Sequence, residues 1–253
     1  MKKAGGFLRT YWGTLLLVAC FGLSYTYVTN NRIIDTFLFP PPARINAALT
    51  GHFDNLIMGM LHSFKLLFPG LAIGTAIALL LGIPMGMKKV IRRNLHPFAY
   101  SFSVIPVVLL TPFCINLTPN FTMASVCLII YGTTWPTLFA TITGIQTIDR
   151  RYLDQAAVLE IKGAEKMFRI LLPAAMPAIL AGFINSLRIA FLALVYAEMF
   201  GAKYGMGYFI QYYYNLAMFD NVMAGMIFLI AVLIVVMQVF ERAKDGLLKW
   251  AVD

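Results

Sequence analysis

The segment RRYLDQAAVLEIKGAEKMFRILLPAAMP, residues 150–177, is rich in charged residues and lies between two long apolar stretches. Within it, apolar residues recur every three or four positions, at Leu153, Ala157, Ile161, Ala164 and Phe168. This spacing predicts a narrow apolar stripe along one face of a short helix. The segment ends at Leu172-Pro173, after which apolar sequence resumes. We expect a charged, amphipathic hairpin in this position to contact a soluble partner.

The composition places the rest of the chain in a membrane. Of the 253 residues, 60% are hydrophobic and 12% are charged, whereas a soluble domain carries about 25% charged residues. The net charge of +9 is explained by the excess of Lys and Arg that cytoplasmic loops carry. We therefore expect lipid around the chain and no nucleic acid as a partner.

Six apolar stretches are long enough to cross a bilayer as helices, which takes about 20 residues each. They cover residues 11–28, 66–87, 97–117, 121–148, 177–200 and 222–240. The sequence thus predicts an all-α integral membrane protein with six transmembrane helices. The first stretch follows basic residues, as a signal peptide does, but a signal core has only about 7–15 apolar residues. We expect the first helix to be retained.

The positions of Lys and Arg predict the orientation. With the N-terminus inside, fifteen of the 20 Lys and Arg residues lie on the cytoplasmic side, and Arg32, Arg44 and Lys203 lie outside. Because cytoplasmic loops are enriched in these residues, we predict that both termini and the charged hairpin are cytoplasmic. The aromatic segment 201–220 then lies outside, either as an interfacial belt or as a contact for the pathway or an external partner.

Four residues within the predicted spans are candidates for a transport pathway. Pro106 and Pro112 each remove a backbone donor from the third span, which is therefore either a kinked helix or a lining of the pathway. A charge at bilayer depth costs at least about 2.5–3.5 kcal/mol. Arg188 is expected either to be satisfied by a neighbouring helix or to face the route of an anionic solute. Glu198 lies about 15 Å further along the same helix.

Several kinds of chemistry lack a motif in this sequence. It contains no G-x-x-x-x-G-K-[ST] phosphate loop, no H-E-x-x-H or C-x-x-C spacing and no G-x-S-x-G elbow. We expect no catalytic residue, no metal site and no cofactor on this chain, so that any ATP binds to another subunit.

The hairpin resembles the cytoplasmic signature loop of permease subunits of ABC importers. The family's pattern begins Glu-Ala-Ala, has Gly four residues after the second Ala, and ends near Leu-Pro. Here Gln155-Ala156-Ala157 corresponds to the start and Leu172-Pro173 to the end. The sequence departs from the pattern in two places, because Gln155 replaces Glu and Ile161 occupies the Gly position. Gly163 is the nearest glycine.

The resemblance covers about residues 60 to 250. Ile105-Pro106 and Thr111-Pro112 resemble the proline-marked third span of the family. Ala197-Glu198 followed by Gly205-Met206-Gly207-Tyr208 is similar to the branch that carries nitrate, sulfonates and taurine. Residues 1–60 would then form an N-terminal transmembrane helix and an external loop. Residues 61–253 would form the permease core, with the coupling loop at about 150–175, between helices 4 and 5.

The resemblance implies a transport subunit and not an enzyme. It implies a homodimer of permease chains in the bacterial plasma (inner) membrane, two cytoplasmic ATPase subunits that hold ATP and Mg, and an external solute-binding protein. It assigns contact with the ATPase to Leu153, Gln155, Ala156, Ala157, Ile161, Gly163, Leu172 and Pro173. The solute would be a small anion such as a sulfonate, taurine or nitrate. A heterocycle resembling a thiamine precursor, an ion-coupled secondary transporter and a channel or scaffold remain alternatives.

Overall fold

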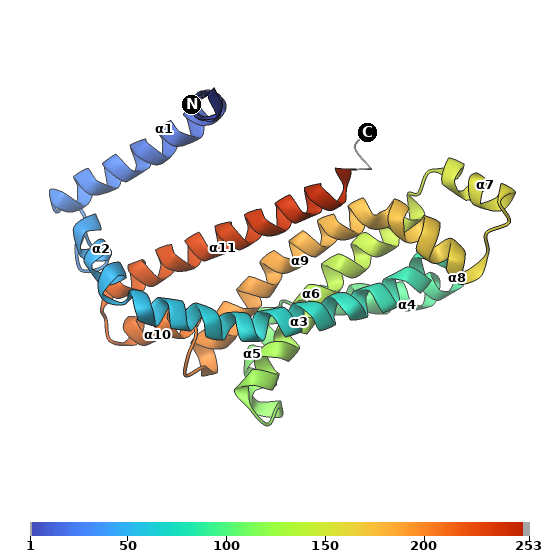
Figure 1. Cartoon of the computed structure of the whole chain (residues 1–253). Coiled ribbons are helices and arrows are strands. Elements are labelled where there is room, and N and C mark those ends of the chain that lie inside the picture. Colours follow the sequence, from blue (N-terminus) through green and yellow to red (C-terminus); the bar gives the residue numbers. More distant parts are fainter. Residues whose placement is uncertain (1, 250–253) are drawn as a thin grey trace.

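The computed structural model describes residues 2–249, with the surroundings of side chains described for residues 12–13 and 16–249. The described chain is helical, and Figure 1 shows its elements in order. They are α1 (Lys2–Asn30), α2 (Pro42–Gly51), α3 (Phe53–Met87), α4 (Lys89–Ser103), α5 (Val107–Leu117), α6 (Phe121–Gln146), α7 (Arg150–Val158), α8 (Gly163–Lys166), the π-helical turn η1 (Met167–Leu171), α9 (Leu172–Gly201), α10 (Met206–Asn215) and α11 (Phe219–Leu247).

Four of these helical segments are long and apolar enough to cross a membrane: Phe53–Met87, Phe121–Gln146, Gly163–Gly201 and Phe219–Leu247. The pair α4 and α5 makes a fifth span if its two bent halves count as one. The predicted first span, residues 11–28, falls within α1, whose described apolar part, Leu16–Asn30, is shorter than a span. The all-helical membrane fold is confirmed, and the sixth span and the orientation stay predictions.

The start of the second span was predicted wrongly. α3 begins at Phe53, thirteen residues before the predicted position 66, so part of the expected external loop is helix. This part carries the polar residues Asp54, Asn55, His62 and Lys65, so an apolar pattern does not reveal that it is helical. The helix continues past the apolar run because its buried side still packs on protein, for example at Leu56 and Gly59.

α6 is the central helix of the bundle, because α3 and α9 pack closely on two of its sides. On α3, glycines spaced four or eight residues apart meet α6 residues with the same spacing: Gly70 meets Ile129, Gly74 meets Thr133, Gly82 meets Thr141 and Gly86 meets Ile145. Small residues at this spacing allow two membrane helices to approach closely. The two series rise together, so α3 and α6 run parallel.

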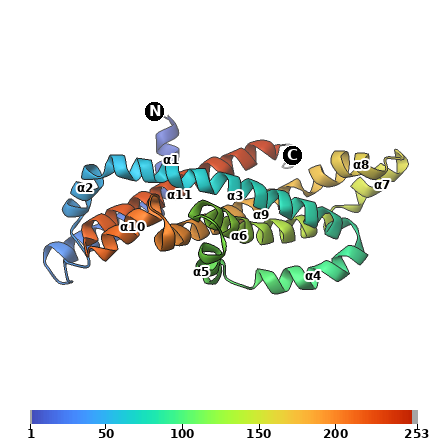
Figure 2. The same cartoon turned by 90° about the horizontal axis from the view of Figure 1, so that it is seen from below.

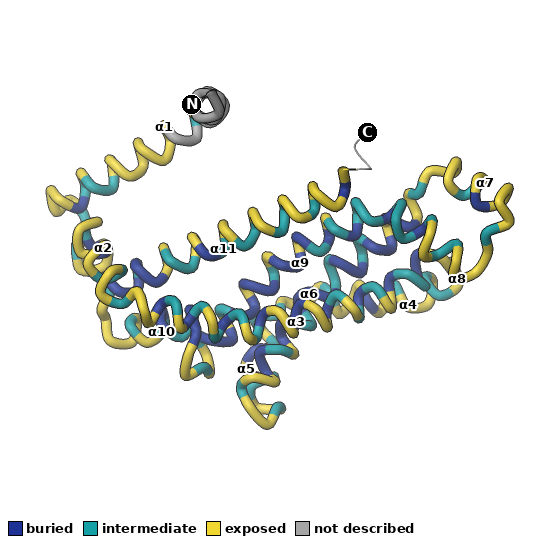
Figure 3. Tube along the Cα trace, in the orientation of Figure 1, coloured by how far each residue is buried: buried dark blue, intermediate teal, exposed yellow. Residues whose placement is uncertain are grey.

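α9 packs on α6 in the opposite direction. Gly132 of α6 faces Ile189, and Gly144, further along α6, faces Ala178, which comes earlier in α9. Between these contacts the hydroxyl oxygens of Thr137 and Ser186 are 2.7 Å apart, and Ser186 donates to the carbonyl of Thr133 at 2.7 Å. Figure 3 shows the buried residues concentrated along α6, α9 and α3, whereas the described part of α1 is largely exposed.

These helix directions separate the two ends of the bundle. The C-terminal ends of α3 and α6 lie with the start of α9 and the hairpin α7–α8, which projects beyond the bundle (Figures 1 and 2). We call this the hairpin end. At the opposite end, Arg44 of α2 pairs with Asp220 of α11 at 2.8 Å, and α10 packs on α3, α9 and α11. We call this the distal end. The basic cluster 88–93 therefore lies at the hairpin end, as the charge distribution predicted.

The packing of α3 on α6 predicts the effect of enlarging one glycine. A Cβ at Gly74 would overlap Oγ1 of Thr133, so Gly74→Leu should destabilise the chain by about 1–3 kcal/mol through overpacking. The matched control is Ala76→Leu, because Ala76 lies on the same helix and is exposed. Thermal unfolding in detergent should show a lower midpoint for Gly74→Leu alone. Equal midpoints for the two variants would contradict the close packing.

Candidate functional site

In the hairpin at residues 149–171, both ends of its first helix, α7, are capped by hydrogen bonds. Asp149 accepts a hydrogen bond from the backbone N–H of Arg151 at 2.9 Å and so caps the start of α7. At the other end, the N–H of Ile161 donates to the carbonyl of Ala156 at 3.0 Å, and the N–H of Glu160 donates to that of Ala157 at 3.1 Å. This pair of bonds is a Schellman motif. α7 is therefore a short helix with a defined C-terminal end.

The predicted apolar stripe does not run along one helix. α7 ends at Val158, and the chain turns through Glu160 (φ 56°) and Gly163 (φ 62°). Ile161, Ala164 and Phe168 thus lie beyond the turn. Left-handed backbone strongly disfavours a β-branched residue, so the turn uses Glu160 and leaves Ile161 in the next position. Because the left-handed residue of the turn is Glu160, position 161 does not need to be glycine.

The two alanines of the hairpin differ in exposure. Ala156 is fully buried within the chain, whereas Ala157 is exposed. Three of the other predicted coupling residues, Gln155, Ile161 and Pro173, line one open pocket of about 370 Å³ between α7 and the start of α9. The remaining predicted coupling residues divide between half-buried positions, at Leu153 and Leu172, and an exposed position, at Gly163.

The third predicted span is broken and not merely kinked. α4 and α5 meet at 87°, and Pro106 lies at the break, where it removes the donor that the carbonyl of Phe102 would use in a helix. The hydroxyl of Tyr131 on α6 donates to the Phe102 carbonyl instead, and it also lies 3.3 Å from the carbonyl of Ile105. Pro112, in contrast, lies inside the continuous helix α5.

One face of α9 stays exposed although the helix is a membrane span. The residues on this face recur at helical spacing: Ala181, Asn185, Arg188, Leu192 and Tyr196. The side chain of Arg188 is 59% exposed and pairs with Glu241 of α11 at 3.6 Å. Three polar side chains on a face that this chain leaves open require water or another protein surface, because lipid cannot satisfy them. We call these residues the α9 stripe.

The α9 stripe contains residues that the sequence reasoning missed. Asn185 and Tyr196 were not singled out, although they stand three residues before and eight residues after Arg188. Helical periodicity counted outward from the arginine would have found them. Arg188 contacts a neighbouring helix through Glu241, and most of its side chain is exposed within this chain. Its place on the route of an anionic solute stays a prediction.

Glu198 is enclosed at the distal end and is only 1% exposed. Its carboxylate accepts hydrogen bonds from the hydroxyl of Ser63 at 2.6 Å and from the N–H of Gly207 at 2.8 Å. The Ser63 hydroxyl also accepts a hydrogen bond from the N–H of Met206 at 3.0 Å. The carboxylate thus joins α3 and α9 to the N-terminus of α10, where a negative charge is favourable. We call this arrangement the Glu198 clasp.

The loop before α10 is shaped around the Glu198 clasp. Gly205 has φ 128°, a conformation that favours glycine, and a Cβ there would overlap the carboxylate of Glu198. Gly59 of α3 approaches the backbone of Gly205 closely. The sequence pattern already grouped Glu198 with Gly205 and Gly207. Ser63 was missed, because a lone serine in an apolar helix carries no distinctive signal.

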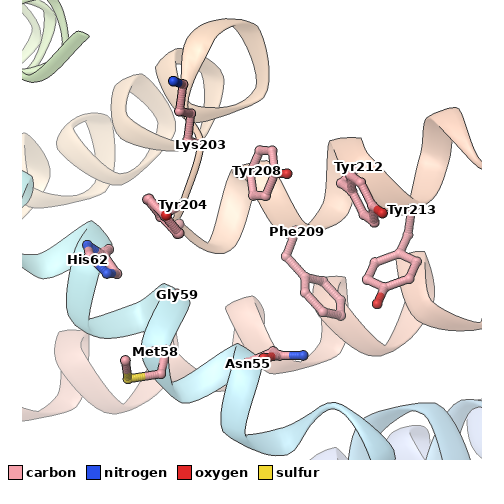
Figure 4. A pocket seen from close by; sticks show the side chains of 11 residues that line it. Asn55, Met58, Gly59, His62, Lys203, Tyr204, Tyr208, Phe209, Tyr212 and Tyr213 are labelled. Carbon is pink, nitrogen blue, oxygen red and sulfur yellow. The ribbon is translucent and has the colours of Figure 1, made fainter.

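Beside this loop is an aromatic pocket of about 410 Å³, drawn in Figure 4. It lies between the first half of α3 and α10, and Phe209, Tyr212 and Tyr213 line it from α10. The ring of His62 stacks on that of Tyr204, with centroids 5.0 Å apart. In the described part of the chain, no three His, Cys, Asp or Glu residues gather as metal ligands would.

The chain is similar to a known protein family and to named transport permeases. Residues 57–249 match the family model described as binding-protein-dependent transport system inner membrane component. A relative from Bacillus subtilis, named provisionally as an aliphatic sulfonates transport permease, is 33% identical over 182 residues, which cover 72% of this chain. The nitrate import permease of Synechococcus elongatus is 29% identical over 146 residues, which cover 58% of this chain. The matched segments span 66% and 52% of these relatives' own lengths.

Two solved structures share the fold. An amino acid ABC transporter crystallised with histidines superposes with a TM-score of 0.63 at 16% identity, over 79% of this chain and 95% of that one. The MetNI methionine ABC transporter in an inward-facing conformation gives a TM-score of 0.62 at 14% identity, over 77% of this chain and 95% of that one.

The Glu198 clasp predicts a stability defect for a variant that keeps the shape of the side chain. Glu198→Gln would turn an amide N–H₂ toward either the Ser63 hydroxyl or the Gly207 N–H, so at least one charged hydrogen bond is lost. Each such bond contributes about 1.5–3 kcal/mol. Thermal unfolding in detergent should show this loss for Glu198→Gln. The control, Glu241→Gln, alters a half-buried carboxylate with a long ion pair and should change stability little; comparable losses would contradict the clasp.

Proposed function

This chain belongs to the family of binding-protein-dependent transport system inner membrane components, and from that premise we propose that it is the pathway-forming subunit of an ATP-driven importer. It is a multi-pass protein of the bacterial plasma membrane. In the proposed complex, two copies of the chain form the solute pathway, with six transmembrane helices each and both termini in the cytoplasm. Two cytoplasmic ATPase subunits bind ATP and Mg, and an external binding protein delivers the solute.

The hairpin is the proposed contact with the ATPase. It projects from the bundle, its helix α7 is capped at both ends, and it joins α6 and α9 directly. Ala157 faces outward from α7, and its small side chain would allow a groove of the ATPase to approach the helix closely. Movement of the ATPase subunits would then shift the start of α9, which continues through the membrane to Gly201.

The solute that we propose is a small anion, and the exposed arginine of the α9 stripe is the observation that carries this choice. A guanidinium at membrane depth costs several kcal/mol unless it faces water or a partner. Arg188 has one long ion pair, to Glu241 at 3.6 Å, so most of its donors are free for an oxyanion. The sulfonate and nitrate relatives agree with this chemistry, since both names specify anions.

The alternative of an ion-coupled secondary transporter has less support. Such a transporter is expected to expose a carboxylate to its pathway near the midplane. Glu198 is enclosed and hydrogen-bonded to protein, and Glu241 is held in an ion pair with Arg188 at 3.6 Å. No specific observation therefore favours ion coupling over ATP.

Substitutions at the two alanines should separate coupling from stability. Ala157→Glu places a charge on the exposed side of α7 and should lower solute uptake per ATP hydrolysed by about tenfold or more, equivalent to losing about 1.4 kcal/mol of docking energy. Uptake and hydrolysis are measured together in proteoliposomes containing the complete complex. Ala156→Glu buries the charge inside the chain and should destabilise the chain itself. Normal coupling in a stable Ala157→Glu complex would exclude the hairpin as the coupling element.

Removal of the arginine charge tests the anionic solute. Arg188→Gln should reduce ATP-driven uptake of a sulfonate or nitrate about tenfold to hundredfold at low solute concentration, because a charged hydrogen bond is worth about 1.5–3 kcal/mol. The experiment compares radiolabelled taurine and nitrate in proteoliposomes. Arg188→Lys should retain part of the uptake. Unchanged uptake by well-folded Arg188→Gln would remove this residue from the pathway.

A further inference from the structure

A second pocket with unpaired cations lies at the distal end. Its volume is about 430 Å³, and it lies between α3, the start of α6 and the loop that joins α9 to α10. Lys65 and His62 line it from α3, Thr122 lines it from α6, and Lys203 and Tyr204 line it from the loop. Two lysines that are far apart in the sequence therefore line one cavity. We call it the lysine pocket.

The lysine pocket lacks a compensating carboxylate. Within residues 12–13 and 16–249, neither Lys65 nor Lys203 forms an ion pair. Arg44, also at the distal end, is neutralised by Asp220 at 2.8 Å. Glu198 is close in sequence to Lys203, but both of its oxygens are taken up by the Glu198 clasp. Two like charges around one cavity repel each other unless an anion lies between them.

The walls of the lysine pocket are held in place. Tyr204 stacks on His62, and the Glu198 clasp holds Met206 and Gly207, the two residues that follow Gly205. Figure 4 shows the amine of Lys203 directed away from the aromatic pocket, while Tyr204 lies over His62. His62, Lys203 and Tyr204 line both the aromatic pocket and the lysine pocket, so the two pockets share a wall.

The start of α6 adds to the positive potential. The side chain of Asn120 accepts a hydrogen bond from the N–H of Met123 at 2.9 Å. Phe121 and Thr122 precede Met123 in the first turn of this 26-residue helix. The first N–H groups of a helix have no partner within it and favour anions. The hydroxyl of Thr122 is a further donor at the edge of the same cavity.

We propose that the lysine pocket is an external subsite for a small oxyanion, separate from the α9 stripe. The ligand class is a singly charged sulfonate or nitrate-type ion that the two ammonium groups and the Thr122 hydroxyl bind from three sides. The headgroup phosphate of a lipid shares this chemistry, and we assign the pocket to the free solute. That assignment rests on the proposed function, because the pocket lies at the end where an importer receives its solute.

The test measures binding of ethanesulfonate to the full chain in phosphatidylcholine nanodiscs by isothermal titration calorimetry, without ATP or ATPase. The wild type should bind saturably, and the double variant Lys65→Gln/Lys203→Gln should bind at least about tenfold more weakly. The matched control is Lys88→Gln/Lys89→Gln, which removes the same two charges at the hairpin end and should bind within about twofold of the wild type. All variants are first checked for an unchanged unfolding midpoint.

Three results would overturn the proposal. Equal weakening by both double variants would indicate general charge attraction, and unchanged binding by Lys65→Gln/Lys203→Gln would place the anion outside this pocket. Loss of wild-type binding when phosphatidylglycerol is added to the nanodiscs would assign the pocket to lipid headgroups. The importer proposal is judged separately by ATP-driven uptake: uptake without ethanesulfonate binding removes only the subsite, and binding in a system whose uptake ignores ATP removes only the importer.

Discussion

Close packing of α6 against α3 and α9 is the constraint on which the rest of the structure depends. Lipid tails are as apolar as the side chains, so the hydrophobic effect does not drive membrane helices together, and close approach through small residues does. The glycines of α3 allow that approach along four turns, and Gly132, Gly144 and Gly182 do the same between α6 and α9. This packing sets the helix directions, which in turn place the hairpin at one end and the Glu198 clasp at the other.

Some polar groups in this bundle are satisfied by the chain itself, and others stay exposed. The carbonyls freed at the break before α5 are satisfied by Tyr131, and the Glu198 carboxylate is satisfied by Ser63 and Gly207. These groups hold helices together, because an unpaired polar group in hydrocarbon costs several kcal/mol. Arg188 differs, since much of its side chain remains exposed within one chain. The contrast separates polar residues that build the fold from the one that the proposed function assigns to the solute.

Much of the architecture could be predicted from the sequence, because apolar length and the distribution of Lys and Arg report directly on membrane spans. The hairpin could be located for the same reason. Its register could not, since the exposure of Ala156 and Ala157 depends on where α7 ends, and that end is set by the backbone bonds of Glu160 and Ile161. The early start of α3 was also missed, because a helix that packs on protein beyond the apolar run has no apolar signal.

α9 connects the two ends of the molecule as a single element. It begins at η1, next to the hairpin, and ends at Gly201, next to the loop that carries Lys203. Thirty residues of helix span about 45 Å, and the close packing on α6 resists bending. The wide π-helical turn of η1 is an irregularity of the kind that often marks functional positions in helices. A displacement of the hairpin can therefore be absorbed at η1 or passed along α9 as a rigid body. In the second case the α9 stripe and the loop at the distal end move together, because both are fixed to the same helix.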